Sequence, residues 1–284
     1  MKGIILGAGA GSRLYPSTLV TSKLLLPIYD KPMVYYPLAV LMDAKIREVM
    51  IISSPKDKQR FMDLFGDGSK FGMKISYGVQ EVPTGIVSAF LIGEEFIGDD
   101  SCALILGDNI FYGSGLREKV LKASEDTKNN EVTLFGYEVP DPERFGVVAF
   151  DENNKVLSIE EKPAKPRSNY AVTGLYFYPK GVADMAKKVK PSARGEYEIT
   201  DLNNLYLSLN NVKVELLDSS YLWLDTGTFS SLLDASNIIA KKQETEPVAI
   251  LELIAYKNGW ISKEELEKAG QSMSKNSYGQ YLLK

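Results

Sequence analysis

Short apolar runs and amphipathic segments alternate along the first half of the chain. Apolar runs bounded by glycine or polar residues predict strands, and segments with helical periodicity predict helices. The expected strands are residues 4–6, 49–53, 74–79, 102–106 and 131–139. The expected helices are residues 33–44, 56–65, 85–96 and 116–127. This alternation predicts an α/β fold, a three-layer α/β/α sandwich around a mixed, mostly parallel sheet.

The pattern changes after Pro140. Residues 147–150 and 156–160 flank the polar segment 151–154, which predicts a β-hairpin. Further strands are expected at 170–178, 213–217 and 221–224, and helices at 182–189, 199–209, 229–244 and 263–269. The sequence has no internal repeat, low-complexity stretch or long linker. We therefore expect one domain over 1–284, with a core over about 1–228 and a C-terminal helical appendage over about 229–284 for packing or subunit contact.

The composition is that of an ordinary globular protein. Of 284 residues, 44% are hydrophobic and 25% are charged, and the net charge of −4 argues against nucleic acid or an anionic membrane as partner. No run approaches the roughly 18 apolar residues of a membrane span. The N-terminal residues are typical of a strand rather than a secretion signal, so we expect a cytoplasmic protein.

Two absences restrict the chemistry. Cys102 is the only cysteine and the chain has no histidine. These facts exclude an intrachain disulfide, a cysteine-cluster zinc site, and every mechanism that needs an imidazole base or ligand. Carboxylates, lysine, arginine, backbone dipoles and a hard metal ion remain. That set suits phosphoryl or nucleotidyl transfer, where catalysis is mostly positioning and charge neutralisation.

A glycine-rich segment, Gly7-Ala8-Gly9-Ala10-Gly11-Ser12-Arg13, follows the first strand. Such glycines let backbone N–H groups close on a phosphate chain, and Arg13 and Lys23 add cations. We therefore predict a nucleotide site.

Three other interpretations of this segment agree less well with the sequence. A dinucleotide-binding turn requires G-x-G-x-x-G opening into a helix. Here Ser12 replaces the last glycine, and Pro16 and Pro27 make residues 15–31 a long loop. The chain also lacks a G-x-x-x-x-G-K-[ST] motif for a Walker-type NTPase. A glycine turn without a ligand would leave the two cations unexplained.

Two aspartates each follow an apolar stretch and lie within two residues of a glycine. Asp108 comes after strand 102–106, and Asp225 comes after residues 221–224. Open α/β sheets bind ligands at the carboxyl ends of their strands, so this pair could hold one Mg²⁺ with phosphate oxygens and water. The alternative for each is a turn or helix cap.

Weaker signals accompany these residues. Lys162 precedes Pro163, which is expected to hold it extended and aim its side chain. Segments 145–147 and 169–174 carry groups of the kind that bind a sugar, whereas Glu160 is more typical of a solvated face. Gln80 and Gly85 flank Pro83 and could offer a bidentate amide and a bare backbone edge to a base.

Together these segments resemble the sugar-1-phosphate nucleotidylyltransferases. Besides the glycine loop, the resemblance rests on residues 26–33 (LPIYDKPM), 106–113 (LGDNIFYG), 141–148, 160–163 (EEKP), 168–178, 190–196, 223–228 (WLDTGT) and 278–281. It implies a Rossmann-like nucleotidyltransferase fold, Mg²⁺ dependence and a homotetramer. It also implies the reaction dTTP + glucose 1-phosphate ⇌ dTDP-glucose + pyrophosphate, which supplies dTDP-rhamnose and other deoxysugar synthesis.

The resemblance also implies roles for individual residues. The catalytic cations are Arg13, Lys23 and Lys162. The residues expected at the nucleotide are Gly7, Ala8, Gly9, Gly11, Ser12, Gln80, Pro83, Gly85 and Asp108. Those expected at the sugar are Asn109, Gly146, Glu161, Lys162, Val172 and Tyr176. Asp108 and Asp225 are the expected metal ligands.

The sequence departs from the family pattern in three places. Gly7-Ala8-Gly9 replaces the usual Ala-Gly-Gly, and Leu24 replaces a glutamine. Ser114-Gly115 and Ser219-Ser220 replace a histidine- and arginine-bearing pattern that resembles a second, regulatory nucleotide site. Two alternatives stay open: UTP in place of dTTP, since one ring methyl is worth only roughly 1–3 kcal/mol, and a non-catalytic sugar-nucleotide sensor, which predicts loss of a loop cation or a metal carboxylate.

Overall fold

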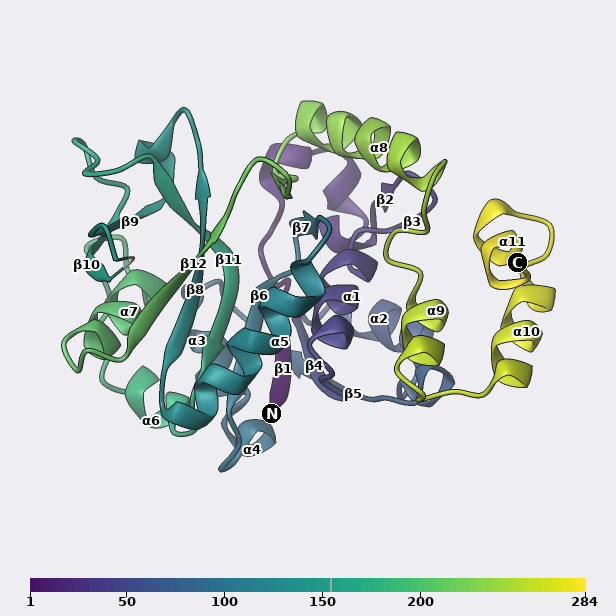
Figure 1. The fold of residues 1–284 in the computed structure, drawn as a ribbon, viewed down its shortest axis with the longest axis horizontal. Helices are drawn as coiled ribbons and strands as arrows, with labels where there is room; N and C mark the ends of the chain where they lie inside the picture. The colour runs from purple at the N-terminus through teal and green to yellow at the C-terminus, as the bar shows by residue number, and fades with distance from the viewer. Residues whose placement is uncertain (154) are drawn as a thin grey trace.

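A large mixed sheet forms the centre of the computed structural model, which describes residues 1–153 and 155–284 (Figure 1). The order of neighbouring strands is β10-β9-β11-β6-β1-β4-β5, and β8 pairs with β11 and β12. These strands are β1 (Lys2–Leu6), β4 (Glu48–Ser53), β5 (Lys74–Val79), β6 (Cys102–Leu106), β8 (Val132–Glu138), β9 (Gly146–Phe150), β10 (Val156–Glu161), β11 (Tyr170–Tyr178) and β12 (Val212–Leu217).

Most strands of this sheet run in one direction. β6, β1, β4 and β5 are mutually parallel, and β11 is antiparallel to β6. Because β8 and β9 are both antiparallel to β11, and β12 is parallel to β8, all three run the same way as β6. Only β11 and β10 oppose the other described strands, so the predicted mixed, mostly parallel sheet is confirmed.

Helices cover both faces of the sheet because its strands are apolar on both sides. Ile4 and Ile5 are both fully buried, and as neighbours in one strand they point to opposite faces. Ile5 belongs to the core cluster that includes residues of α1 (Tyr35–Asp43), α2 (Lys58–Phe65) and α5 (Leu116–Asp126). Ile4 belongs to a second cluster, with residues of α3 (Ser88–Ile92), α6 (Val182–Ala186) and α7 (Ile199–Leu207). The three-layer α/β/α architecture follows.

The C-terminal helices extend these layers. α8 (Phe229–Gln243) buries Ala235 and Ile239 in one cluster with Ile28 of β2 and Tyr36 of α1. Residues of α9 (Leu251–Lys257), α10 (Lys263–Ser272) and α11 (Ser277–Leu282) join the core cluster that contains α1. Figure 1 shows these helices on the α1 and α2 side of the molecule.

Several predicted elements differ from the structure. The helix expected at 85–96 is two short helices, α3 and α4 (Glu94–Ile97), divided at Gly93. It begins late because Tyr197 accepts a backbone bond from Val87 and donates one to Thr84. Small elements were missed: β2 (Pro27–Ile28), β3 (Lys31–Pro32), β7 (Asn109–Tyr112), α9 and α11. The predicted hairpin between β9 and β10 forms, although Asn154 in its turn lies outside the described residues.

The long loop expected at 15–31 is confirmed. It holds only short 3₁₀ turns, η2 (Ser17–Leu19) and η3 (Lys23–Leu25), before β2. A further turn, η1 (Ser12–Leu14), ends the glycine segment. None of the described helices has the length and apolar character that a membrane crossing requires.

Candidate active site

The carboxyl ends of β1, β4 and β6 meet at one edge of the sheet. Gly7 N–H donates to Ile52 O at 2.8 Å, and Gly107 N–H donates to Leu6 O at 2.9 Å. The fully buried Leu24 lies over both glycines, since a Cβ on either would come within 2.2 Å of Leu24 Cδ2. Leu24, which departs from the family pattern, is thus a packing residue. Its contact is enough to require glycine at residue 7, whether or not a ligand binds there.

Gly9 and Gly11 have different reasons to be glycine. Gly11 has φ 61°, in the left-handed region, and stands immediately before η1. A Cβ on Gly9 would meet no protein atom within 4 Å, so packing does not demand glycine there. The bare, exposed backbone at Gly9, next to exposed Ser12 and buried Ala8, is the part of the loop that a phosphate chain can approach closely.

The two loop cations sit in different settings. Lys23 Nζ is hydrogen-bonded to Asp108 Oδ2, and both side chains are largely buried. Arg13 is exposed at the end of η1, with its guanidinium against Gly227. No carboxylate of the described residues lies within ion-pairing distance of Arg13. Arg13 is therefore the cation available to a phosphate, and Lys23 becomes available when another cation neutralises Asp108.

Asp108 and Asp225 are brought together by a small second sheet. β7 pairs with β13 (Leu222–Asp225) so that Asp225 lies opposite Asn109, the neighbour of Asp108. Asp225 therefore ends a strand, as expected, but that strand lies outside the main sheet. Both carboxylates line one cavity of about 210 Å³.

The pKa values of the two acids are shifted in opposite directions. Burial alone would raise the pKa of Asp108, but the charge and hydrogen bond of Lys23 outweigh burial, so its pKa is lowered. Burial and the negative charge of Asp108 raise the pKa of Asp225, against the opposing charges of Lys23, Arg13 and Arg144. Two carboxylates that repel each other in one cavity are a donor set that suits a divalent cation with oxygen ligands. No group of three potential ligands occurs among the described residues, so phosphate oxygens and water would complete the shell.

The cavity also contains the residues expected at the sugar. It is lined by Arg13, Asp108, Asn109, Gly146, Glu161, Lys162, Val172, Tyr176 and Asp225 from the predicted set. Its volume lies below the roughly 300–1,000 Å³ of pockets for drug-sized ligands, which suits a hexose better than a whole nucleotide. Glu161 is fixed there by Thr200, whose hydroxyl donates to Glu161 Oε2 at 2.7 Å.

Asn109 also has a structural role in this cavity. Its Oδ1 accepts from Gly174 N at 3.0 Å and from Trp223 Nε1 at 2.7 Å, and its Nδ2 donates to Asp108 Oδ1 at 3.2 Å. A sugar hydroxyl would compete with these bonds. Asn109 therefore joins β7, β11 and β13 and holds the Trp223 ring at the cavity wall.

The extended conformation expected for Lys162 before Pro163 is wrong. Lys162 has φ 43°, in the left-handed region, and its N–H continues the β10–β9 pairing by donating to Phe145 O at 2.9 Å. Such a backbone costs about 1–3 kcal/mol in a non-glycine residue and is concentrated at functional sites. The side chain is half exposed, with Nζ 3.8 Å from Glu161 Oε1. Lys162 is thus held at the cavity rim by a strained turn.

The structure adds lining residues that sequence reasoning missed. They are Ile86, Arg144, Glu198, Thr200 and Trp223, whereas Phe145 belongs to the segment 145–147 that was expected at the sugar. Arg144 and Trp223 lie within segments on which the family resemblance rests, and Thr200 lies close to one, so that proximity was the available signal. Arg194 was also missed; it bonds Glu198 at 2.9 Å and reaches Glu161 at 3.7 Å.

The residues expected at the base lie beside this cavity rather than in it. Gln80 is buried and its N–H bonds Ser53 O, which places it at the same sheet edge. Its side-chain Nε2 donates to Ser88 Oγ and, at 3.4 Å, to Gly85 O, while Ser88 Oγ also donates to Gly85 O. These bonds orient the amide and occupy its nitrogen. The expected bidentate contact is therefore not available, and the carbonyl oxygen of Gln80 remains for a ligand; Pro83 is exposed nearby.

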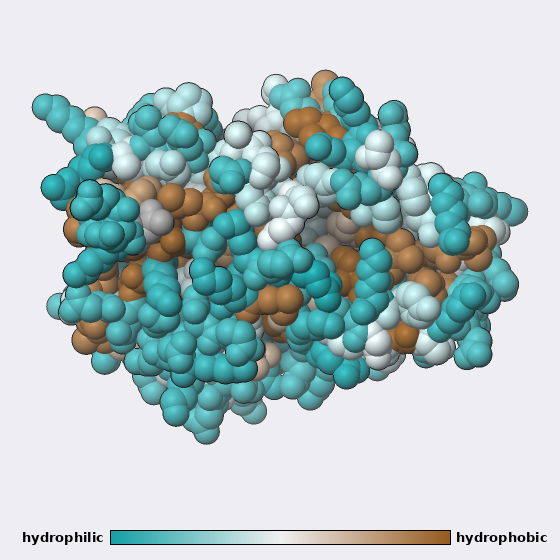
Figure 2. Space-filling model, viewed as in Figure 1, coloured by the Kyte–Doolittle hydropathy of each residue, from teal (hydrophilic) through white to brown (hydrophobic). Residues whose placement is uncertain are grey.

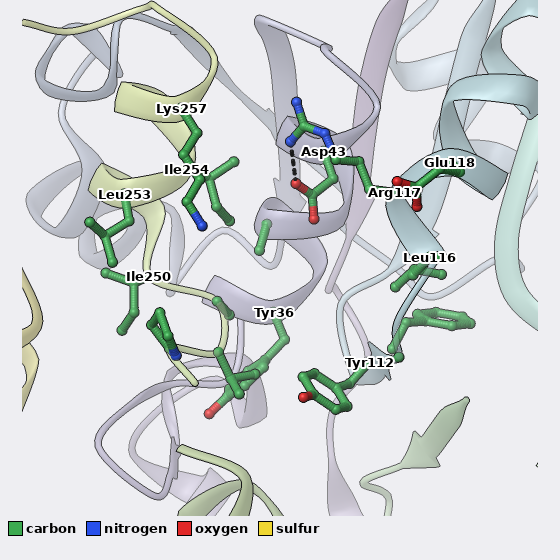
Figure 3. A pocket seen from close by; sticks show the side chains of 17 residues that line it. Tyr36, Asp43, Tyr112, Leu116, Arg117, Glu118, Ile250, Leu253, Ile254 and Lys257 are labelled. Carbon is green, nitrogen blue, oxygen red and sulfur yellow. Dashed lines mark hydrogen bonds and ion pairs between the residues drawn. The ribbon is translucent and has the colours of Figure 1, made fainter. Parts of the chain in front are cut away.

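A separate pocket of about 530 Å³ lies between α1, α5 and α9 (Figure 3). Arg117 pairs with Asp43 at 2.9 Å and bonds Asn258 at 2.8 Å beside it. Figure 2 shows apolar side chains gathered between α5 and α9 on this face. Gly115 lines the pocket, whereas Ser219 lines a different hollow. The described lining includes neither the glycine loop nor Asp108 and Asp225, so this pocket is separate from the cavity that the two acids line.

The family model described as nucleotidyl transferase matches residues 2–242, a range that holds the glycine loop, Asp108, Asp225 and the residues that line the 210 Å³ cavity. The chain belongs to the nucleotidyl transferase family. Its resemblance to sugar-1-phosphate nucleotidylyltransferases is thereby confirmed.

Curated relatives match this nucleotidyl transferase over its full length. It is 53% identical over 286 residues to glucose-1-phosphate thymidylyltransferase of Neisseria meningitidis, with 100% of this chain and 99% of the relative covered. It is 48% identical to the enzyme of the same name from Mycobacterium tuberculosis, with 100% and 98% covered. A crystal structure of UDP-glucose pyrophosphorylase complexed with UDP-glucose superimposes with a TM-score of 0.74 at 25% identity, over 85% of this chain and 98% of that one.

Proposed function

We propose that this nucleotidyl transferase moves a thymidylyl group from dTTP to glucose 1-phosphate, giving dTDP-glucose and pyrophosphate. The observation that carries the proposal is the convergence of Arg13, Lys162 and the Asp108–Asp225 pair on one hexose-sized cavity beside the glycine loop. The full-length relatives named for this activity support it. A non-catalytic sensor is disfavoured because every loop cation and cavity acid is present.

The reaction needs no side-chain base. A sugar phosphate is largely dianionic near neutral pH, since its second pKa is about 6. One of its oxygens attacks the α-phosphorus, and the bond between that phosphorus and the β-phosphate oxygen breaks, so pyrophosphate leaves with the electron pair. Lys162 would hold the attacking phosphate, and Arg13 and Lys23 would hold the triphosphate and stabilise charge on the leaving pyrophosphate.

The acid pair fits a magnesium ion. Asp108 and Asp225 would hold it, and when bound it would supply charge neutralisation at the phosphates. Burial and the negative charge of Asp108 raise the pKa of Asp225, so ionising Asp225 costs free energy. A bound cation would offset that cost. Lys23 would then exchange its bond with Asp108 for a phosphate oxygen.

Gln80 would read the base through its carbonyl oxygen. That oxygen accepts from the N3–H that thymine and uracil share, whereas cytosine presents no hydrogen at N3. The site would therefore prefer thymine and uracil to cytosine. Only contacts to the ring methyl would make the affinity for dTTP differ from that for UTP. UTP remains the second candidate, favoured by the structural similarity to UDP-glucose pyrophosphorylase.

The proposal is tested by pyrophosphate release with purified protein, magnesium, glucose 1-phosphate and each of dTTP, UTP and dCTP. We expect dTTP to have the highest kcat/KM, UTP to be used at a lower value, and dCTP to be poorer than UTP by about tenfold or more. Higher kcat/KM with UTP than with dTTP would replace the first candidate by the second. No pyrophosphate with any of the three would refute both.

Substitution K162A is expected to raise KM for glucose 1-phosphate by about tenfold to a hundredfold, because one charged hydrogen bond to the sugar phosphate is lost. The KM for dTTP should change little. Initial rates with each substrate varied check this, with K165A as the control, since Lys165 is an exposed lysine on the same loop. Equal increases in both KM values would assign Lys162 to another role.

The proposal extends to the organisation of the protein. We infer one domain over residues 1–284, a homotetramer and a cytoplasmic location. The packing of α8–α11 on α1 supports the first of these, and the family resemblance supports the second.

A further inference from the structure

Three of the charged groups proposed to act on the triphosphate come from segments far apart in the chain. Arg13 lies in η1, Asp108 follows β6, and Asp225 ends β13. One two-residue turn, Thr226-Gly227, contacts the first two and is covalently joined to the third. Thr226 and Gly227 are both buried, although they lie between Asp225 and the exposed start of α8.

Thr226 binds the backbone that carries Asp108. Its hydroxyl donates to Asp108 O at 2.8 Å and its N–H donates to the same oxygen at 3.2 Å. Thr226 is fully buried, so water cannot replace these bonds. Because Asp225 directly precedes Thr226, the two bonds fix the backbone of one acid against that of the other.

Gly227 leaves room for Arg13. A Cβ on Gly227 would lie 3.0 Å from Nη2, 3.1 Å from Cζ and 3.2 Å from Nη1 of Arg13. The backbone of Gly227 is not among those with positive φ, so an L residue could adopt it. A methyl group at residue 227 would therefore push the guanidinium away by a few tenths of an ångström. Arg13 has no ion-pair partner among the described residues, so nothing of that kind opposes such a displacement.

The turn is also held from the other side. Thr228 begins α8 with a capping box, in which its hydroxyl accepts from Ser231 N at 3.2 Å and its N–H donates to Ser231 Oγ at 3.0 Å. The turn is therefore fixed at both ends, by β13 before it and by α8 after it.

We propose that Thr226 and Gly227 are positioning residues for nucleotidyl transfer: Thr226 sets the spacing of the two acids, and Gly227 sets the guanidinium of Arg13 toward the same phosphates. This inference rests on the proposed function of the acids and of Arg13. It assigns the turn a role in nucleotide and magnesium affinity rather than in the stability of the fold alone.

The Gly227 part is tested by G227A, R13A and the double variant, with dTTP binding measured by calorimetry in magnesium-containing buffer. We expect G227A to weaken dTTP binding by about tenfold, the value of one displaced charged hydrogen bond. It should have no further effect in the R13A background, because the two changes act on one group. Wild-type affinity in G227A, or an equal loss with and without Arg13, would overturn the assignment.

The Thr226 part is tested by T226V and T226S. Serine keeps the hydroxyl and should restore wild-type behaviour, whereas valine should raise the magnesium concentration for half-maximal dTTP binding by about tenfold. Unchanged magnesium dependence in T226V, or the same loss in T226S, would overturn it. A wild-type protein that binds dTTP but releases no pyrophosphate would refute the proposed function and leave these binding tests intact.

Discussion

Substitution D225N is expected to abolish most turnover and at the same time to stabilise the protein. A metal ion at the phosphates is worth several kcal/mol of transition-state stabilisation, so loss of one of its two carboxylates should lower kcat by at least about a hundredfold. Stability should change in the other direction. In the absence of magnesium, Asp225 is a partly buried charge that faces Asp108, and asparagine removes that repulsion.

The sign of the stability change follows from the raised pKa of Asp225. A carboxyl whose folded-state pKa lies above its unfolded value of about 3.9 favours folding fully only at pH below that value. This contribution is lost as the pH rises through the folded pKa, so wild type carries a penalty at neutral pH that D225N lacks. The gain in melting temperature should therefore be present at neutral pH and vanish near about pH 4.

Thermal unfolding with and without magnesium, together with initial rates, measures both effects. Magnesium should stabilise wild type and leave D225N unchanged. D234N is the matched control, because Asp234 is an exposed aspartate on α8 with no role in the cavity. A D225N protein with near-wild-type turnover would remove Asp225 from the metal site.

Substitution K23M is expected to cost both activity and stability. Lys23 is the partner of a largely buried carboxylate, and breaking such a pair leaves Asp108 uncompensated. We expect a loss of about 2 kcal/mol or more of unfolding free energy at neutral pH, since fully buried pairs cost about 3–5 kcal/mol when one partner is removed. Turnover should fall by about a hundredfold or more, because a cation facing the leaving pyrophosphate is lost.

The stabilisation that the Lys23–Asp108 pair contributes depends on pH in the opposite direction from the contribution of Asp225. The pKa of Asp108 is lowered, because the charge and hydrogen bond of Lys23 outweigh burial. Its ionised form therefore stabilises the fold above the unfolded pKa of about 3.9, and this contribution is lost as the pH falls through the folded value. Wild type and K23M should differ at neutral pH and converge in acid.

Chemical denaturation of wild type, K23M, D108N and K23M/D108N measures the coupling. The double variant should lose less than the sum of the two single losses, since both act on one pair. K56M is the matched control, because Lys56 is exposed in a loop. Strictly additive losses would show that Lys23 and Asp108 do not interact in solution.

The sequence predicts those parts of the molecule that local pattern determines. β5, β6 and β11 were predicted with the bounds that the structure gives them, because β6 is a continuous apolar segment, β5 alternates polar or glycine residues with apolar ones, and β11 is rich in aromatic residues. Asp108 was predicted because it directly follows such a strand. The loop at 15–31 was predicted from its prolines, which fix φ and remove backbone donors.

Contacts between distant segments could not be predicted in this way. Thr200 reaches Glu161 from a different element, and Trp223 reaches Asn109 across a two-stranded sheet. The conformation of Lys162 was predicted wrongly because the preference of a residue before proline for an extended backbone is only local, and at the end of the β10–β9 pairing the chain adopts φ 43° instead. α9 and α11 were missed because tertiary packing on α1, rather than their own length or periodicity, stabilises them.

A structure of the protein with dTTP and magnesium tests the central claim most directly. The claim is that one triphosphate is bound by the glycine loop, by Arg13 and by a cation shared between Asp108 and Asp225. We expect the phosphates along Gly9–Ser12 with a magnesium ion between the two carboxylates, and Lys23 moved from Asp108 to a phosphate oxygen. A triphosphate bound elsewhere, for instance between α1 and α9, with Lys23 still paired to Asp108, would contradict the claim.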